Sequence, residues 1–258
     1  MCGKSDAGGV RAPAVIVIAA ISGVLAMSQP RYADCAPIKI HSPSVTKGKN
    51  EIEYLGFRDI DKDDERDGAE MHSIAIGRGF TDYWLSELSL VYAKEPGASL
   101  EYDSLEWENL FRLSKKDQYW AEFGLFTQYE ATEDGADEIL IAPIVEKTVD
   151  RWVGTMNLFF GRKVGSEAES GTSFSYAARL RYSMHKQFAP AIEIFGDLGR
   201  IGEFDSFNEQ EHWAGPAFYG QIGMGGSNKV VYSAAYLFGV TSVSSDNRAI
   251  LRIEYEFF

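Results

Sequence analysis

The stretch Thr172–Met184, TSFSYAARLRYSM, decides the fold because its residues alternate in character. One set of alternate positions carries the residues Phe174, Tyr176, Ala178, Leu180, Tyr182 and Met184. The other set carries the residues Ser173, Ser175, Ala177, Arg179, Arg181 and Ser183. A helix, with a period of about 3.6 residues, would mix the two sets, whereas a strand places them on opposite faces. The stretch therefore predicts a β-strand with one apolar and one polar face.

The same alternation recurs along the chain after Lys47 and predicts an all-β protein. Polar connections, alternately short and longer, separate the alternating segments, as strands joined by turns require. The twelve predicted strands cover residues 49–60, 69–79, 83–94, 100–113, 119–130, 138–147, 152–163, 172–184, 190–199, 212–223, 229–240 and 248–258. We expect a closed antiparallel β-barrel of about twelve strands over residues 48–258, because connections that alternate between short turns and longer loops are typical of membrane barrels.

The composition excludes several other classes of protein. Aromatic residues make up 13% of the chain, yet the mean hydropathy is −0.20, which is too polar for a bundle of membrane helices. The net charge of −13 disfavours a nucleic-acid partner, which would need a basic face. Two cysteines, Cys2 and Cys35, give neither a disulfide framework nor a zinc pattern.

The N-terminus has the pattern of a secretory leader. A polar start with Lys4 and Arg11 precedes the apolar run Ala12–Met27, and small residues follow. The run is shorter than the roughly 20 residues that a membrane-spanning helix needs, which disfavours an anchor helix. Residues 1–28 are therefore predicted to be a signal peptide, with cleavage between 28 and 36. Residues 29–47 are predicted to form a short periplasmic segment ahead of the barrel.

Three of the five tryptophans recur at the same place in the predicted hairpins. Trp84, Trp120 and Trp152 each open a strand after a short turn. Tryptophan prefers the boundary between membrane and water because its ring is apolar and its N–H seeks a polar partner. This spacing is typical of an aromatic girdle at one rim of a membrane barrel.

The chain ends in the alternating aromatic strand Leu251–Phe258, LRIEYEFF, whose outward set ends at Phe257. With its leader and its alternating turns, the chain resembles the outer-membrane β-barrel proteins of Gram-negative bacteria, including small porin-like barrels of unassigned function. The resemblance implies a transmembrane barrel with both termini in the periplasm, surrounded by outer-membrane lipid and lipopolysaccharide. It also implies that the barrel-assembly machinery recognises the C-terminal strand.

If the apolar face meets lipid, the polar face lines the lumen, because charges facing lipid are costly. The residues expected to line the pore are Glu51, Glu53, Glu87, Glu106, Glu108, Arg112, Glu122, Arg179, Arg181, Glu193, Arg252 and Glu254. Arg248 and Arg252 are expected to close against Glu51 and Glu53. Two interpretations stay open: the charges pair and fill the lumen, or they line a water-filled channel with weak ion selectivity.

The first functional hypothesis is accordingly a narrow channel for small polar solutes or ions, and the alternative is a non-conducting structural or accessory barrel. A membrane-embedded lipid hydrolase is a third hypothesis, which needs a nucleophile beside a histidine base. The neighbours His72 and Ser73 point to opposite faces of a strand and cannot meet, so no catalytic residue is predicted.

The acidic stretch Asp59–Glu70 resembles a calcium-binding loop only superficially. Its sixth position is Asp64, where an EF-hand loop requires glycine, and strands rather than helices flank it. A solvated loop is the expectation, and no metal or other cofactor is predicted.

Overall fold

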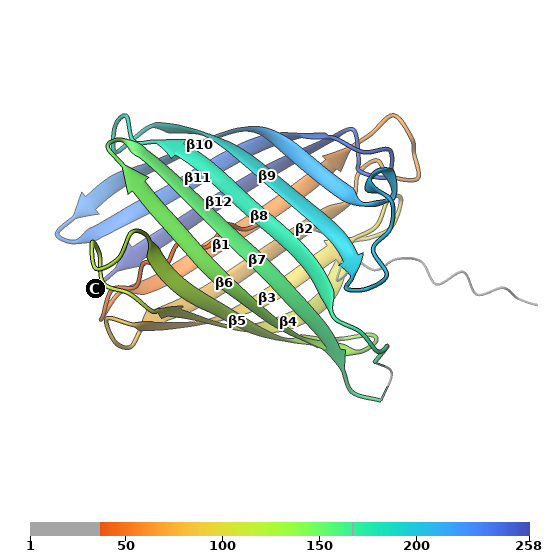
Figure 1. Ribbon diagram of the computed structural model, residues 1–258, viewed down its shortest axis with the longest axis horizontal. Helices are drawn as coiled ribbons and strands as arrows, with labels where there is room; N and C mark the ends of the chain where they lie inside the picture. Colours follow the sequence, from red (N-terminus) through yellow and green to blue (C-terminus); the bar gives the residue numbers. More distant parts are fainter. Residues whose placement is uncertain (1–36, 167) are drawn as a thin grey trace, which may run out of the picture. The chain divides into compact units, whose positions relative to one another are not determined.

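The computed structural model describes residues 37–166 and 168–258, and it contains a closed barrel of twelve antiparallel strands (Figure 1). The strands are β1(Asn50–Ile60), β2(Glu70–Gly79), β3(Trp84–Lys94), β4(Glu101–Arg112), β5(Glu122–Thr132), β6(Asp137–Val149), β7(Trp152–Val164), β8(Ser173–Tyr182), β9(Ala189–Arg200), β10(Glu211–Gly225), β11(Asn228–Gly239) and β12(Asn247–Phe257). The predicted all-β, closed antiparallel barrel and its strand number are confirmed; that it spans a membrane with both termini in the periplasm stays a prediction. The predicted signal peptide and its cleavage site lie outside the described residues.

Each strand pairs with its neighbours in sequence, and β12 returns to pair with β1. This seam is continuous, running from Asn50 opposite Phe257 to Ile60 opposite Asn247. A single turn of 3-10 helix, η2(Phe207–Glu209), lies in the connection between β9 and β10. No helix in the described part of the chain is long and apolar enough to cross a membrane.

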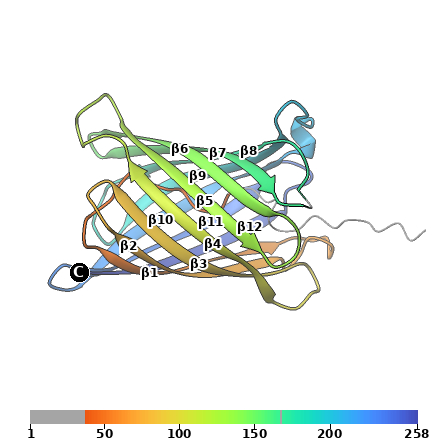
Figure 2. The same ribbon diagram turned by 90° about the horizontal axis from the view of Figure 1, so that it is seen from below.

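The two ends of the barrel differ (Figure 2). The wall begins at Asn50 and finishes at Phe257 at one end, together with the shortest connections, such as the two residues between β6 and β7; we call this the turn end. The opposite end carries longer connections such as the one between β9 and β10, and we call it the loop end. Trp84 and Trp152 open strands at the turn end, and Trp120 precedes β5 there.

The outward-facing positions are apolar, as the alternation predicts. Ile76 and Ile192 are 61% and 62% exposed, and Leu180 of the opening stretch is also exposed, whereas Arg179 beside it is buried. Outward charged residues such as Arg58 and Glu70, which form an ion pair, lie near the loop end. The surface between the two ends is therefore apolar.

The inside of the barrel is divided into two halves. From the turn end, the inward positions of β1 are Glu51, Glu53, Leu55, Phe57 and Asp59, all of them buried. Facing strands extend the apolar middle with residues such as Phe126, Phe159, Phe195, Trp213, Leu237 and Ile250, which form one buried cluster. A charged half near the turn end thus adjoins a half with an apolar middle and the buried charge of Asp59 beyond it, and the expectation of a polar lumen had not foreseen this apolar middle.

Candidate functional site

The described residues ahead of β1 lie inside the barrel. Residues 37–47, which we call the strap, had been expected in the periplasm; the contacts described below place them against the inner wall instead. At the turn end the Gly48 N–H donates to the Gly79 carbonyl, at 2.8 Å. A Cβ at Gly79 would overlap the main-chain oxygen of Thr46, and one at Gly124 would lie 2.8 Å from Pro43. The wall therefore makes room for the strap with glycines.

The strap rises from the turn end toward the middle of the barrel. His41 N–H donates to Asn157 Oδ1 at 2.7 Å, and Asn157 Nδ2 donates to the His41 carbonyl at 2.9 Å. The side-chain amide of β7 thus binds the strap main chain as a paired strand would. The His41 ring stacks on Phe126 with 3.9 Å between centroids, and Ile40 belongs to the buried apolar cluster.

Lys39 places its ammonium among three carboxylates from three different strands. Its Nζ lies 2.7 Å from Glu53 of β1, 3.2 Å from Glu87 of β3 and 3.6 Å from Glu108 of β4. We call these three acids the carboxylate cage. Glu53 and Glu87 are each only 3% exposed, so their charges are largely removed from water and depend on a nearby cation.

A second polar cluster holds the strap on the opposite wall. Ser42 Oγ donates to Glu146 at 2.5 Å, and Thr155 Oγ1 donates to the same carboxylate oxygen at 2.8 Å. Arg179 donates to the hydroxyl oxygens of Ser42 and Thr155, and its guanidinium lies 4.6 Å from the ring centroid of Tyr219. This cluster joins β6, β7, β8 and β10 to the strap.

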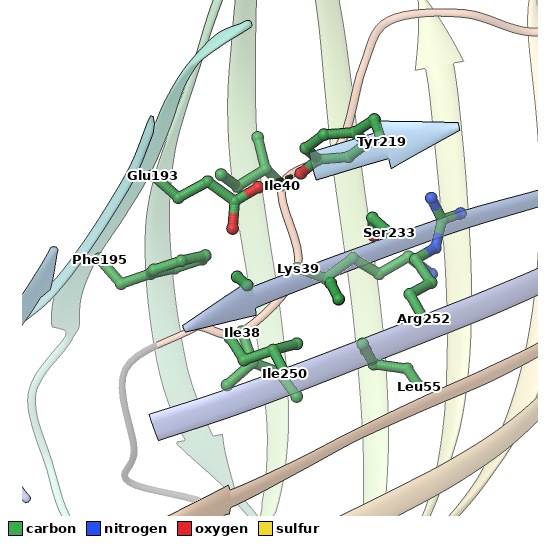
Figure 3. A pocket seen from close by; sticks show the side chains of 12 residues that line it. Ile38, Lys39, Ile40, Leu55, Glu193, Phe195, Tyr219, Ser233, Ile250 and Arg252 are labelled. Carbon is green, nitrogen blue, oxygen red and sulfur yellow. Dashed lines mark hydrogen bonds between the residues drawn. The ribbon is translucent and has the colours of Figure 1, made fainter. Parts of the chain in front are cut away.

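A small cavity adjoins the strap inside the barrel. A cavity of about 20 Å³ beside the strap is lined by residues that include Ile38, Lys39, Leu55, Phe195 and Arg252 (Figure 3). That volume holds about one water molecule. The strap thus occupies part of the lumen here.

Toward the loop end, charged and aromatic side chains of neighbouring strands pack together on the inner wall. Arg248 of β12 makes two hydrogen bonds to Asp59 of β1, from Nε at 2.6 Å and from a terminal nitrogen at 2.8 Å. The guanidinium also lies 4.2 Å from the ring centroid of Phe57 and 3.9 Å from that of Trp213. The expectation that Arg248 meets Glu51 or Glu53 was therefore wrong, because Asp59 is its direct cross-strand neighbour.

Most of the predicted lining residues are brought into contact with a partner. Arg252 pairs with both Glu53 and Glu254, and Lys49 pairs with Glu51 and Glu254. Of the remaining predicted residues, Glu106 accepts a hydrogen bond from Gln128 and Glu193 accepts one from Tyr219. Arg181 lies over the Tyr219 ring, and Arg112 donates a hydrogen bond to the Ser114 carbonyl. Glu122 lies opposite Glu146 at the turn end. The sequence analysis missed Lys39, His41, Ser42, Lys49 and Asn157.

The outer wall carries two tyrosine–histidine pairs. Tyr54 Oη and His72 Nδ1 share a hydrogen bond of 2.8 Å, and Tyr176 and His212 share one of 3.1 Å. Ser73 pairs in register with the inward Leu55 and lies on the luminal face, away from His72. These contacts provide no nucleophile–base pair from His72 and Ser73, and the absence of an enzymatic activity stays a prediction.

The acidic loop between β1 and β2 is held by an arginine and by the neighbouring loop. Arg66 Nε donates to Asp61 at 2.9 Å, and the N–H groups of Asp63 and Asp246 donate to the same carboxylate at 2.8 and 2.9 Å. These hydrogen bonds, that of Arg66 above all, lower the pKa of Asp61 from 3.8 to about 2. The loop is thus tied to the connection between β11 and β12.

The fold and its interior define a class: a closed twelve-stranded antiparallel barrel, apolar outside, whose charged inner half surrounds a segment of its own chain. No protein-family model matches the chain, and no curated protein matches its sequence. A solved structure described as a bacterial polysaccharide outer membrane secretin is similar with a TM-score of 0.37 and 7% sequence identity, covering 84% of this chain and 99% of that chain. At that TM-score the similarity carries no functional conclusion.

Proposed function

We propose that this protein is an outer-membrane barrel whose lumen is a narrow channel for small polar solutes or ions, closed at rest by its own strap. The observation that carries the proposal is the kind of contact between strap and wall. In the turn half the strap is held by charged and hydrogen-bonding groups, notably the carboxylate cage, Glu146 and Asn157. Without the strap, these groups would line a polar passage.

The location in a membrane is supported by the outer surface. The strands have 10 to 15 residues, and a tilted membrane strand needs about 9–11. Exposed leucine, isoleucine and aromatic side chains cover the wall between the two ends, where water would give them no favourable partner. Outer-membrane lipid and lipopolysaccharide would surround this surface, and the assembly machinery would engage β12.

Planar-bilayer recording tests the channel. The wild-type protein is expected to open rarely, and a variant lacking residues 37–46 is expected to conduct steadily. Asn157→Leu removes both hydrogen bonds to the strap main chain and should raise the open fraction. The matched control is Asn109→Leu, because the Asn109 side chain bonds Trp84 at the wall and not the strap.

A permanently closed accessory barrel is the second candidate, and a specific observation favours it. Toward the loop end, the wall residues Arg248, Asp59, Phe57 and Trp213 pack together on the inner face. If the barrel is permanently closed, the strap-deleted variant will show no conductance. A deleted variant that folds, as its altered gel mobility without boiling would show, yet never conducts would refute the channel.

A further inference from the structure

The cation in the carboxylate cage comes from the strap. Glu53 has a second partner in Arg252, whose Nε donates to it at 2.6 Å. In the part of the chain that the structure describes, Lys39 is the cation within ion-pair distance of both Glu87 and Glu108. The charge of Glu53 is therefore compensated by Arg252 of the wall, whereas Glu87 and Glu108 have their ion-pair partner in Lys39 of the strap.

Withdrawal of the strap would expose an electrostatic deficit. With the strap in place Glu87 and Glu108 are 3% and 9% exposed, and its withdrawal would take away the ammonium that both carboxylates share. Arg252 is held between Glu53 and Glu254, and it attracts Glu87 only at longer range, without an ion pair. An emptied lumen would thus favour any cation able to take the position of the Lys39 ammonium.

The arrangement also indicates which cation fits. A primary ammonium has three N–H donors, and the cage offers three carboxylates from three strands within 2.7 to 3.6 Å of Nζ. Leu55 and Ile250 lie beside the strap at this level and line the adjoining cavity (Figure 3). They supply an apolar surface next to the charged group, which suits the carbon chain of an alkylamine.

We infer that the carboxylate cage is a binding site for the primary ammonium group of a cationic solute, and that Lys39 occupies it as a tethered competitor. The inference rests on the proposed function in one respect: a solute reaches the cage in the native protein only when the strap leaves. Binding in the cage itself is tested separately from conduction.

Chemical rescue of the full chain carrying Lys39→Ala provides the test. The thermal unfolding midpoint is measured by gel mobility in ethylammonium chloride and in tetramethylammonium chloride of equal ionic strength. Ethylammonium should raise the midpoint of Lys39→Ala saturably, whereas tetramethylammonium, which has no N–H, should not. At ten times its dissociation constant, a ligand that binds only the folded state multiplies the folded-to-unfolded ratio about elevenfold. The wild-type protein, whose cage is filled, should show no specific response.

A second substitution keeps the inference falsifiable. Lys39→Ala combined with Glu87→Gln should lose the ethylammonium response, and if Lys39→Ala does not fold, Lys39→Met serves in its place because it keeps the length of the side chain. Equal effects of the two salts, or an unchanged response after Glu87→Gln, would overturn the inference. If the strap-deleted barrel conducts but ethylammonium does not stabilise Lys39→Ala, the binding site in the cage is refuted and the channel is not. If ethylammonium stabilises Lys39→Ala but the strap-deleted barrel does not conduct, the channel is refuted and the binding site is not.

Discussion

The ion pair between Asp59 and Arg248 is expected to dominate the stability of the seam. The two side chains are 8% and 3% exposed and make two short charge-assisted hydrogen bonds. Arg248→Met would leave the Asp59 carboxylate buried beside a thioether and would remove the cation–π contacts with Phe57 and Trp213. Removing one partner of a buried pair costs about 3–5 kcal/mol, so we expect a loss of that size in the free energy of unfolding.

The assay is urea unfolding of the protein refolded in lipid vesicles, followed by tryptophan fluorescence. The matched control is Arg58→Met, which breaks an ion pair of 2.7 Å between Arg58 on the outer face of β1 and Glu70 of β2, where the Arg58 side chain is 58% exposed. Exposed pairs contribute about 0–1 kcal/mol. The double variant Asp59→Leu with Arg248→Met should recover most of the loss, because it leaves no buried charge unpaired. Equal losses for Arg248→Met and Arg58→Met would refute the reasoning.

Two further results are expected. The pKa of Asp61 is lowered to about 2, so its contribution to stability is complete above about pH 4 and is lost as the pH falls toward 2. Asp61→Asn should therefore reduce the fall of the unfolding midpoint between pH 4 and pH 2. An unchanged fall of the midpoint over that range would contradict this assignment. Gly215→Ala should destabilise the barrel by about 1–3 kcal/mol, because its Cβ would overlap the main-chain oxygen of Tyr236. Gly154→Ala, where a Cβ meets nothing within 4 Å, is the control, and equal urea midpoints would count against the close approach.

The wall was predictable because its chemistry is local. Each strand has an apolar and a polar face in its own sequence, and the predicted and observed strand ends differ by three residues at most. The largest difference is at the start of β5, predicted at residue 119 and found at Glu122. There the Ser114 hydroxyl accepts a hydrogen bond from the Phe123 N–H, so ladder pairing begins later than the aromatic pattern indicates.

The interior was less predictable because its contacts are distant in sequence. Alternation placed Glu53, Glu87 and Glu108 on the inner face, but it carries no information about what lies opposite them. Lys39 meets all three from before the first strand, in the segment Ile38-Lys39-Ile40. That short apolar–basic–apolar pattern was the available signal, and it is too brief to be distinguished from an ordinary linker.

The position of the strap also constrains the order of assembly. The seam between β1 and β12 joins the two ends of the wall, and the strap is continuous with β1. A growing sheet can fold its early strands over the strap, with Lys39 neutralising the acids of β3 and β4 before β12 delivers Arg252. A strap left outside when the barrel closes would have to enter the closed barrel and then fit closely against Gly79 and Gly124. We therefore expect the early strands to enclose the strap before the seam between β1 and β12 forms.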